Sequence, residues 1–527
     1  MKTFFLITLL SLVALFESCN AKGAPWTEEE FKIIAEKVWL CVSGNVPNAD
    51  FRKLYPDYEK PSPKVTPNFK KILRLGFHDC LTYENPADGE INGCDGCLNP
   101  TGMALDMMVD FNTDKGEFNG PNVNVTNNNG LGMTADLLEE VFTNKDFPNK
   151  APSLAVSMKD SGKSRADLWA FASILAVMQG IKNNNDACNG KTNAVKNCGT
   201  LKAGEEGCEV NWPALPTFRT GRTDCVTPEG AEKPWHTSVE KHELHPSPNG
   251  NGPETVDFYK KSFGLNAREA FALNAGGHSV GRFNPQVSYG AYSWTRKQEE
   301  QFNNQFARAV AQRPEYFSNC EDWVTGEKKW SLVGDAYGNK AETSWRVVRK
   351  YITKNGGPYQ WHHVYNRCPA SNECATFNRN AAEDRAEPGT PEGCCDDLEP
   401  GMYCQPSCVR EIQNDETAVQ SDMGFYFHFE RDEDGMPRGC PNFESETWLN
   451  GGDGSKGGKY RGVDCGLEAY APDGEPLHQI VEEMADSNEN LMKDFGPAME
   501  KMIHNGYQTE SMDEIPVEWW SHVYDLQ

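Results

Sequence analysis

Two short segments, each centred on a histidine, place the strongest constraint on this chain. They lie two hundred residues apart and read Arg74-Leu75-Gly76-Phe77-His78-Asp79-Cys80 and Ala275-Gly276-Gly277-His278-Ser279-Val280-Gly281. In a helix, Arg74 and His78 share one face because they are four residues apart. The two glycines before His278 carry no side chains, so a large flat group can approach the backbone there. The two histidines are therefore the first candidate functional residues.

Apolar residues recur with helical spacing in seven parts of the chain, whereas strand-like alternation is scarce. The predicted helices are 28–42, 68–80, 132–142, 165–179, 266–278, 295–312 and 477–504. Thr66 and Pro67 suit the cap and the first position of the second helix. Asn266 and Glu269 form a capping box before the fifth helix. The sequence thus predicts a mostly α fold.

The N-terminus has the features of a secretory signal peptide. An apolar run at 4–16 follows Lys2, and small residues precede position 22. We therefore predict a signal peptide over 1–21 and a secreted, extracellular product. The chain has 18 cysteines, and in an oxidising compartment most should form disulfides, although their pairing cannot be read from the sequence. Asn124 begins a sequon, which predicts a glycoprotein.

The formal net charge of −26 argues against partners that need a basic surface. Nucleic acids and anionic membranes are bound by patches of Lys and Arg, so neither is expected here. After the N-terminal run, no apolar stretch reaches the length of a membrane span. We expect a monomer whose partners are small molecules.

Together, the two histidine segments resemble the distal and proximal helices of the plant-type haem peroxidases. The resemblance covers about 28–311 and 459–504, and it implies one helical domain with haem b between the two helices. It makes Arg74 and His78 the catalytic pair that acts on hydrogen peroxide, and His278 the ligand of the haem iron. A surface arginine or a buried histidine alone is more simply explained as a structural residue. The combined match of both segments favours the haem site.

The expected chemistry explains these residue types on the distal side. A neutral His78 can take a proton from hydrogen peroxide and return it to the leaving oxygen. Arg74 can stabilise the charge that separates along the O–O bond. The family orients its distal histidine with an asparagine in a turn, and Asn128 fits that position. Phe77 stands next to the haem, where class I members have tryptophan.

On the proximal side, the family uses a carboxylate that accepts the other imidazole proton and makes the ligand more electron-rich. The resemblance points to Asp464, with Asp453 and Asp473 as alternatives. Trp294 follows His278 by sixteen residues, the offset at which class I members place a tryptophan beside the ligand. Packing against the haem is its simpler role. The chain therefore mixes the signatures of different classes.

A structural calcium is a further implication of the resemblance. Asp79, Asp95 and the carbonyls of Thr82 and Gly93 fall where secreted members bind this ion. Oxygen ligands of this kind suit a hard cation. Cys97 replaces the usual hydroxyl ligand, and sulfur is a poor ligand for calcium. Calcium is thus a candidate cofactor beside haem b.

The composition changes after the sixth predicted helix. Residues 314–459 are rich in Cys, Gly and acidic residues, and they include eight cysteines between 320 and 440. The family has a shorter connection here, so we predict a disulfide-rich insertion. The predicted organisation is a signal peptide at 1–21, a haem peroxidase domain at 22–313, the insertion at 314–459, and completing helices at 460–527.

The resemblance implies a secreted peroxidase that responds to oxidative stress by reducing hydrogen peroxide and oxidising small phenolic or other aromatic donors in one-electron steps. Pro246 falls where such donors dock at the haem edge, although a rigid loop is its simpler role. Two other classes stay open. One is a catalytically silent matrix or adhesion protein on the same scaffold, which the large insertion suggests. The other is a calcium-binding structural module without haem, which the acidic composition suggests.

Overall fold

The structure, a computed structural model, describes the side chains of most residues outside the predicted insertion. These are residues 22–55, 68–82, 93–100, 128, 130–190, 207–212, 215–237, 244–281, 294–295, 299–311, 418–428 and 469–527. Several short strands between 111 and 438 are described by their backbone. The predicted signal peptide at 1–21, Asn124 and Asp464 lie outside the described residues.

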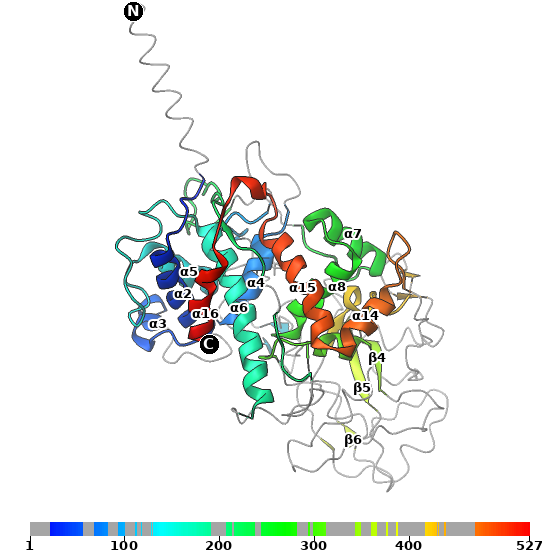
Figure 1. Ribbon diagram of the computed structural model, residues 1–527. Coiled ribbons are helices and arrows are strands. Elements are labelled where there is room, and N and C mark those ends of the chain that lie inside the picture. Colours follow the sequence, from blue (N-terminus) through cyan, green and yellow to red (C-terminus); the bar gives the residue numbers. More distant parts are fainter. Residues whose placement is uncertain are drawn as a thin grey trace, which may run out of the picture.

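Helices dominate the described part of the chain, as the sequence predicts (Figure 1). They include α2 (Glu28–Val42), α3 (Asn48–Leu54), α4 (Phe69–Asp79), α5 (Gly132–Thr143), α6 (Arg165–Cys188), α7 (Gly252–Phe263), α8 (Ala267–Ser279), α10 (Gln305–Val310), α12 (Gln420–Met423), α14 (Leu477–Asp486), α15 (Asn488–Ile503) and α16 (Trp520–Leu526). None of the described helices is long and apolar enough to cross a membrane.

The strands are short and antiparallel. The three-stranded sheet has the order β4 (Thr343–Val348), β5 (Gln360–Tyr365), β8 (Thr417–Val419), with Trp345 opposite His363. Two-stranded pairs join β1 (Phe111–Asn112) to β2 (Glu117–Phe118), β3 (Arg219–Thr220) to β11 (Asp513–Glu514), β6 (Thr376–Phe377) to β7 (Ala386–Glu387), and β9 (Glu430–Arg431) to β10 (Pro437–Arg438). The β3–β11 pair ties the C-terminal region back to the helical core.

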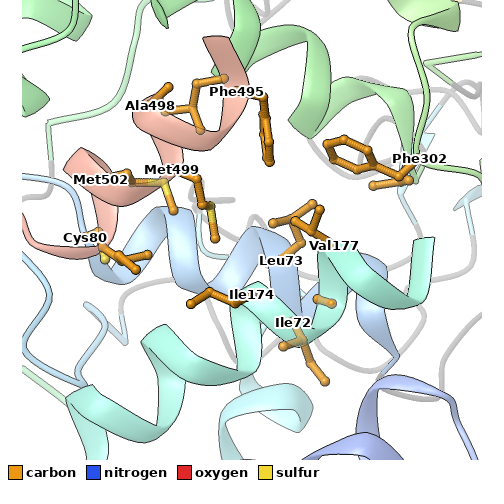
Figure 2. Packing of buried hydrophobic residues seen from close by; sticks show 14 of the residues in the cluster. Ile72, Leu73, Cys80, Ile174, Val177, Phe302, Phe495, Ala498, Met499 and Met502 are labelled. Atoms are coloured by element: carbon orange, nitrogen blue, oxygen red, sulfur yellow. The ribbon is translucent and has the colours of Figure 1, made fainter. Parts of the chain in front are cut away.

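The predicted distal helix, α4, packs closely along α6 (Figure 1). Gly76 makes this approach possible, because a Cβ at that position would lie 2.5 Å from the Cβ of Ser173 on α6. Apolar side chains fill the interface with α15. Figure 2 shows buried side chains of α4 (Ile72 and Leu73), α6 (Ile174 and Val177) and α15 (Met499 and Met502) in this part of the core. Burial of such side chains contributes about 1.5–3 kcal/mol each, so α4 is held in a fixed orientation.

The predicted proximal helix, α8, is held against the C-terminal helices by packing and by charge. A Cβ on Gly276 would lie 2.4 Å from the Phe495 ring, so only glycine allows α15 to come this close. Arg268 on α8 pairs with Glu483 at 2.7 Å and with Asp494 at 3.0 Å. These contacts fix the helix that carries His278.

Two predicted helices differ from the structure near the C-terminal side of the site. The single helix predicted at 477–504 is two helices in the structure. Ser487 between them has an extended backbone, and its side chain caps α15 by accepting a hydrogen bond from the backbone N of Asn490. Within the predicted 295–312, the described helix is the six-residue α10. Local periodicity alone did not reveal either interruption.

The N-terminal ends of two further helices also correct the prediction. Helix α4 starts after Asn68, whose side chain accepts from the backbone N of Lys70, so the cap is not Thr66. Helix α7 was not predicted, although Asn251 and Glu254 form a capping box at its start. That box was a readable signal in the sequence.

Part of the predicted insertion belongs to the helical core. Residues 418–428 lie within 314–459, yet Met423, Phe425 and Phe427 are buried in the main hydrophobic cluster. The apolar run at 423–427 is the signal in the sequence that could have marked this return to the core. Residues 418–428 therefore pack with the helical core, although they fall inside the predicted insertion.

The described cysteines confirm the expectation of disulfides. The bonded pairs are Cys80–Cys94, Cys97–Cys225 and Cys188–Cys208. Cys41 is a buried free thiol, and burial raises its pKa to about 12, which keeps it protonated. It is therefore not a nucleophile at neutral pH.

We expect an Asn266→Ala substitution to lower the free energy of unfolding by about 1 kcal/mol, the usual cost of losing a helix cap. The Asn266 side chain accepts from the backbone N of Glu269 at 2.9 Å, and the Glu269 carboxylate accepts from the backbone N of Asn266 at 3.0 Å. Urea unfolding measures the effect. Asn266→Ser keeps a capping oxygen and should stay near wild type; equal losses in both variants would contradict the capping role.

Candidate functional site

The distal histidine has a defined tautomer. His78 is buried near the end of α4, and its Nδ1 lies 2.8 Å from Oδ1 of Asn128. Asn128 Nδ2 donates to the carbonyl of Asn99 at 3.2 Å, which orients the amide so that Oδ1 faces His78. Oδ1 can only accept, so we assign the proton to Nδ1 of His78. The lone pair of Nε2 is then available to act as a base.

The surroundings of His78 keep it neutral. Burial lowers the pKa of His78 well below its ordinary value, and the charge of Arg74 lowers it further. Arg74 is half-buried one helical turn earlier, as the i, i+4 spacing predicts. The expected pair thus has a guanidinium near a neutral imidazole, and proton transfer from a peroxide needs this combination.

A second imidazole, from His245, adjoins the distal histidine. The two rings meet edge to face with centroids 4.8 Å apart. Burial, followed by the charge of Arg74, lowers the pKa of His245 to about 3. The sequence placed only the neighbouring Pro246 at the site. Pro246 is half-buried in the same loop, which is tied to the end of α4 because Leu244 N donates to the carbonyl of Thr82 at 2.8 Å.

The proximal histidine is bonded to a carboxylate that the sequence did not single out. His278 Nδ1 lies 3.1 Å from Oδ1 of Asp422, whose side chain is fully buried. Asp422 Oδ2 accepts from the backbone N of Val419 at 2.9 Å, which holds the carboxylate in place. The prediction of Asp464 as this partner is corrected, because Nδ1 carries a single proton and Asp422 accepts it. Asp464 itself lies outside the described residues.

Aromatic rings surround His278 on two sides. Trp294 stacks parallel to the imidazole, with centroids 3.8 Å apart and an angle of 10° between the planes. Phe306 meets it edge-on at 5.3 Å. On the distal side, Phe77 is half-buried and its ring lies 5.9 Å from that of His78. The predicted aromatic residues therefore lie beside their respective histidines.

The two glycines before His278 have different functions. Gly276 allows the approach of Phe495, as described above, whereas among the described residues a Cβ on Gly277 would meet no atom within 4 Å. The space that the described residues leave beside Gly277, and the 26% exposure of the His278 side chain, fit a group bound next to the imidazole. With Nδ1 engaged by Asp422, Nε2 is the nitrogen that can bind a metal. These features fit a flat macrocycle held by His278 through its iron.

The candidate calcium ligands are only partly assembled. Asp79 Oδ1 accepts from the backbone N of Gly96 at 2.7 Å, whereas Asp79 Oδ2 is buried without a hydrogen-bond partner among the described residues. Burial and the charge of Asp95 raise the pKa of Asp79 well above its ordinary value. Two adjacent carboxylates fit a cation. However, Cys97 is bonded to Cys225, and no group of three or more His, Cys, Asp or Glu in the described ranges is placed to hold a metal.

The backbone candidates for calcium lie at the two ends of a short segment between Asp79 and Asp95 in the sequence. Thr82 and Gly93 border the segment 83–92, which the Cys80–Cys94 disulfide closes. Asn505 after α15 donates to the carbonyl of Cys80 at 2.7 Å, and the Asn505 carbonyl would lie 2.4 Å from a Cβ on Gly93. This corner of the site is therefore closely packed.

Comparison with known proteins agrees with this geometry. A sequence model described as Peroxidase matches residues 51–328, somewhat more than half of the chain, and the match includes both histidine segments. No curated protein sequence matches the chain. Asp422 lies beyond the matched region, after the start of the predicted insertion. By its matched sequence and its helical fold, the chain belongs to the peroxidase family, within the haem peroxidase superfamily.

Proposed function

We propose that this protein is a secreted haem b peroxidase that reduces hydrogen peroxide and oxidises small phenolic or other aromatic donors by one-electron steps. One observation carries the proposal. Two histidines each have one nitrogen fixed by a hydrogen bond, His78 by Asn128 and His278 by Asp422. Each arrangement selects the opposite nitrogen, Nε2, for chemistry, as a base on the distal side and as a metal ligand on the proximal side.

On the distal side, the chain supplies proton transfer and charge stabilisation. His78 Nε2 takes a proton from one oxygen of hydrogen peroxide and delivers it to the other, which leaves as water. The Arg74 guanidinium stabilises negative charge on the departing oxygen. Asn128 keeps Nε2 unprotonated between cycles, because Nδ1 is the protonated nitrogen.

On the proximal side, His278 would hold the haem iron through Nε2. When bound, the haem supplies the electrons that cleave the O–O bond and accepts electrons from the donors. Asp422 draws the Nδ1 proton of His278 and so increases the electron density of the ligand. Trp294 fixes the plane of the imidazole by stacking on it.

Three finer assignments are part of the proposal. Pro246 and His245, in the loop next to His78, would contact the phenolic substrate, because an imidazole nitrogen and a backbone carbonyl can accept a hydrogen bond from its hydroxyl. A calcium ion at Asp79 and Asp95, with the carbonyls of Thr82 and Gly93, would satisfy the unpartnered Oδ2 of Asp79. Secretion is supported by the apolar N-terminal run and the disulfides.

The test is the absorption spectrum of the purified protein before and after addition of hydrogen peroxide. We expect a haem Soret band that shifts on addition and returns when a phenolic dye is supplied, with oxidation of the dye. A bound haem without peroxide-dependent dye oxidation would instead indicate a silent matrix or adhesion protein on this scaffold. Absence of stoichiometric haem after reconstitution would overturn the proposal.

A further inference from the structure

The proximal carboxylate has a second hydrogen-bond donor. Asp422 Oδ1, which contacts His278 Nδ1 at 3.1 Å, also accepts from Nδ2 of Asn274 at 2.8 Å. Asn274 lies one turn before His278 on α8 and is buried. Both donors therefore compete for the charge of the same oxygen atom, and the Asn274 contact is the shorter one.

A tyrosine from the neighbouring helix fixes the orientation of that amide. The Tyr259 hydroxyl on α7 donates to Oδ1 of Asn274 at 3.2 Å. The reverse orientation of the amide would bring its oxygen against the carboxylate of Asp422, so only one orientation is favourable. Burial and the charge of Asp422 raise the pKa of Tyr259, which keeps the hydroxyl protonated as a donor. The result is one directed chain, from Tyr259 through Asn274 to Asp422.

We propose that Asn274 and Tyr259 are positioning residues that moderate how strongly Asp422 draws the Nδ1 proton of His278. A carboxylate oxygen that accepts two hydrogen bonds spreads its charge over both, so each bond is weaker than a single bond would be. The imidazole then retains more of its proton, and it donates less electron density through Nε2. This inference rests on the proposed function for its consequence at the iron, but the hydrogen-bond chain itself is independent of haem.

Two readouts test the hydrogen-bond chain and its effect on the iron separately. In the haem-free protein labelled with ¹⁵N-histidine, we expect Asn274→Leu to move the His278 Nδ1–H proton resonance downfield, because Asp422 Oδ1 then accepts from His278 alone. In the haem-loaded protein, the same variant should make the Fe(III)/Fe(II) midpoint potential more negative. Leucine keeps the number and branching of the side-chain heavy atoms of asparagine and removes both polar atoms.

The size of the shift should follow the hydrogen-bond chain. Tyr259→Phe, which is isosteric and leaves the Asn274 donor present, should move both readouts in the same direction by a smaller amount. Tyr55→Phe is the matched control, because it removes a hydroxyl that donates to the carbonyl of Met133, on another part of the fold. It should move neither readout.

The outcomes distinguish this inference from the proposed function. If wild type binds no haem, the proposed function fails, and the proton resonance still tests the network. If Asn274→Leu folds, as thermal unfolding checks, and leaves the resonance and the potential unchanged or moves them the other way, the inference is overturned. If Asn274→Leu moves both readouts as expected but Tyr259→Phe leaves both at their wild-type values, the orienting role of Tyr259 is overturned.

Discussion

Replacing His78 with leucine is expected to slow the reaction with hydrogen peroxide by about 10²- to 10⁴-fold, the usual contribution of a positioned acid–base group. The variant removes the imidazole whose Nδ1 contacts Asn128, and with it the Nε2 base. The haem site on the opposite helix should remain loaded, since His278 is untouched. Stopped-flow spectroscopy at varied peroxide concentration measures the rate.

A matched control is His504→Leu. His504 is also buried, and burial with the charge of Arg222 lowers its pKa to about 3, but it lies at the end of α15 with its Nδ1 against the carbonyl of Glu500. Its loss should leave the peroxide rate within a few-fold of wild type. A His78→Leu protein that keeps the full rate would disprove the acid–base assignment.

The pH profile provides a second measure of His78. Because burial and Arg74 lower its pKa, His78 stays neutral where an ordinary imidazole, with a pKa of about 6.5, is half protonated. The peroxide rate should therefore hold steady as the pH falls through that value and decline only at much lower pH. In Arg74→Leu the cationic neighbour is absent, so the acidic limb should move to higher pH.

Replacing Asp422 with asparagine is expected to lower haem-iron affinity or peroxidase activity by about 10- to 100-fold, the usual effect of losing a partner of a metal ligand. A neutral amide oxygen is a weaker acceptor than a carboxylate, so the Nδ1–H of His278 is drawn less strongly and the ligand becomes less electron-rich. Haem titration and steady-state dye oxidation measure the two quantities.

The matched control is Asp464→Asn, which makes the same chemical change at the residue that the sequence favoured. We expect it to leave both quantities near wild type, because Asp422 already accepts the His278 proton at 3.1 Å. A larger loss in Asp464→Asn than in Asp422→Asn would refute the structural assignment and restore the prediction from sequence.

Local features of the chain were predictable from sequence. The i, i+4 spacing of Arg74 and His78, the capping box at Asn266, and the turn that holds Asn128 all depend on residues a few positions apart. Their geometry follows from the helix and the turn themselves. The resemblance to a known family extended this to the hydrogen bond between Asn128 and His78, which is present at 2.8 Å.

Long-range features were not predictable in the same way. Asp422 lies 144 residues after His278, inside a block that looked like an insertion, and it is one of 77 acidic residues in the chain. No periodicity connects two residues at that separation. The interruption at Ser487 was likewise hidden, because apolar spacing continues on both sides of it.

The amino-acid sequence by itself thus determined the mostly helical fold, the family, and which two histidines, His78 and His278, form the candidate site. Only the tertiary structure decided which carboxylate accepts the proton of His278, that Gly276 packs against Phe495, and that His245 adjoins His78. The reason is physical. Helices and caps form from neighbouring residues, whereas a buried carboxylate finds its partner only when the core packs distant segments together.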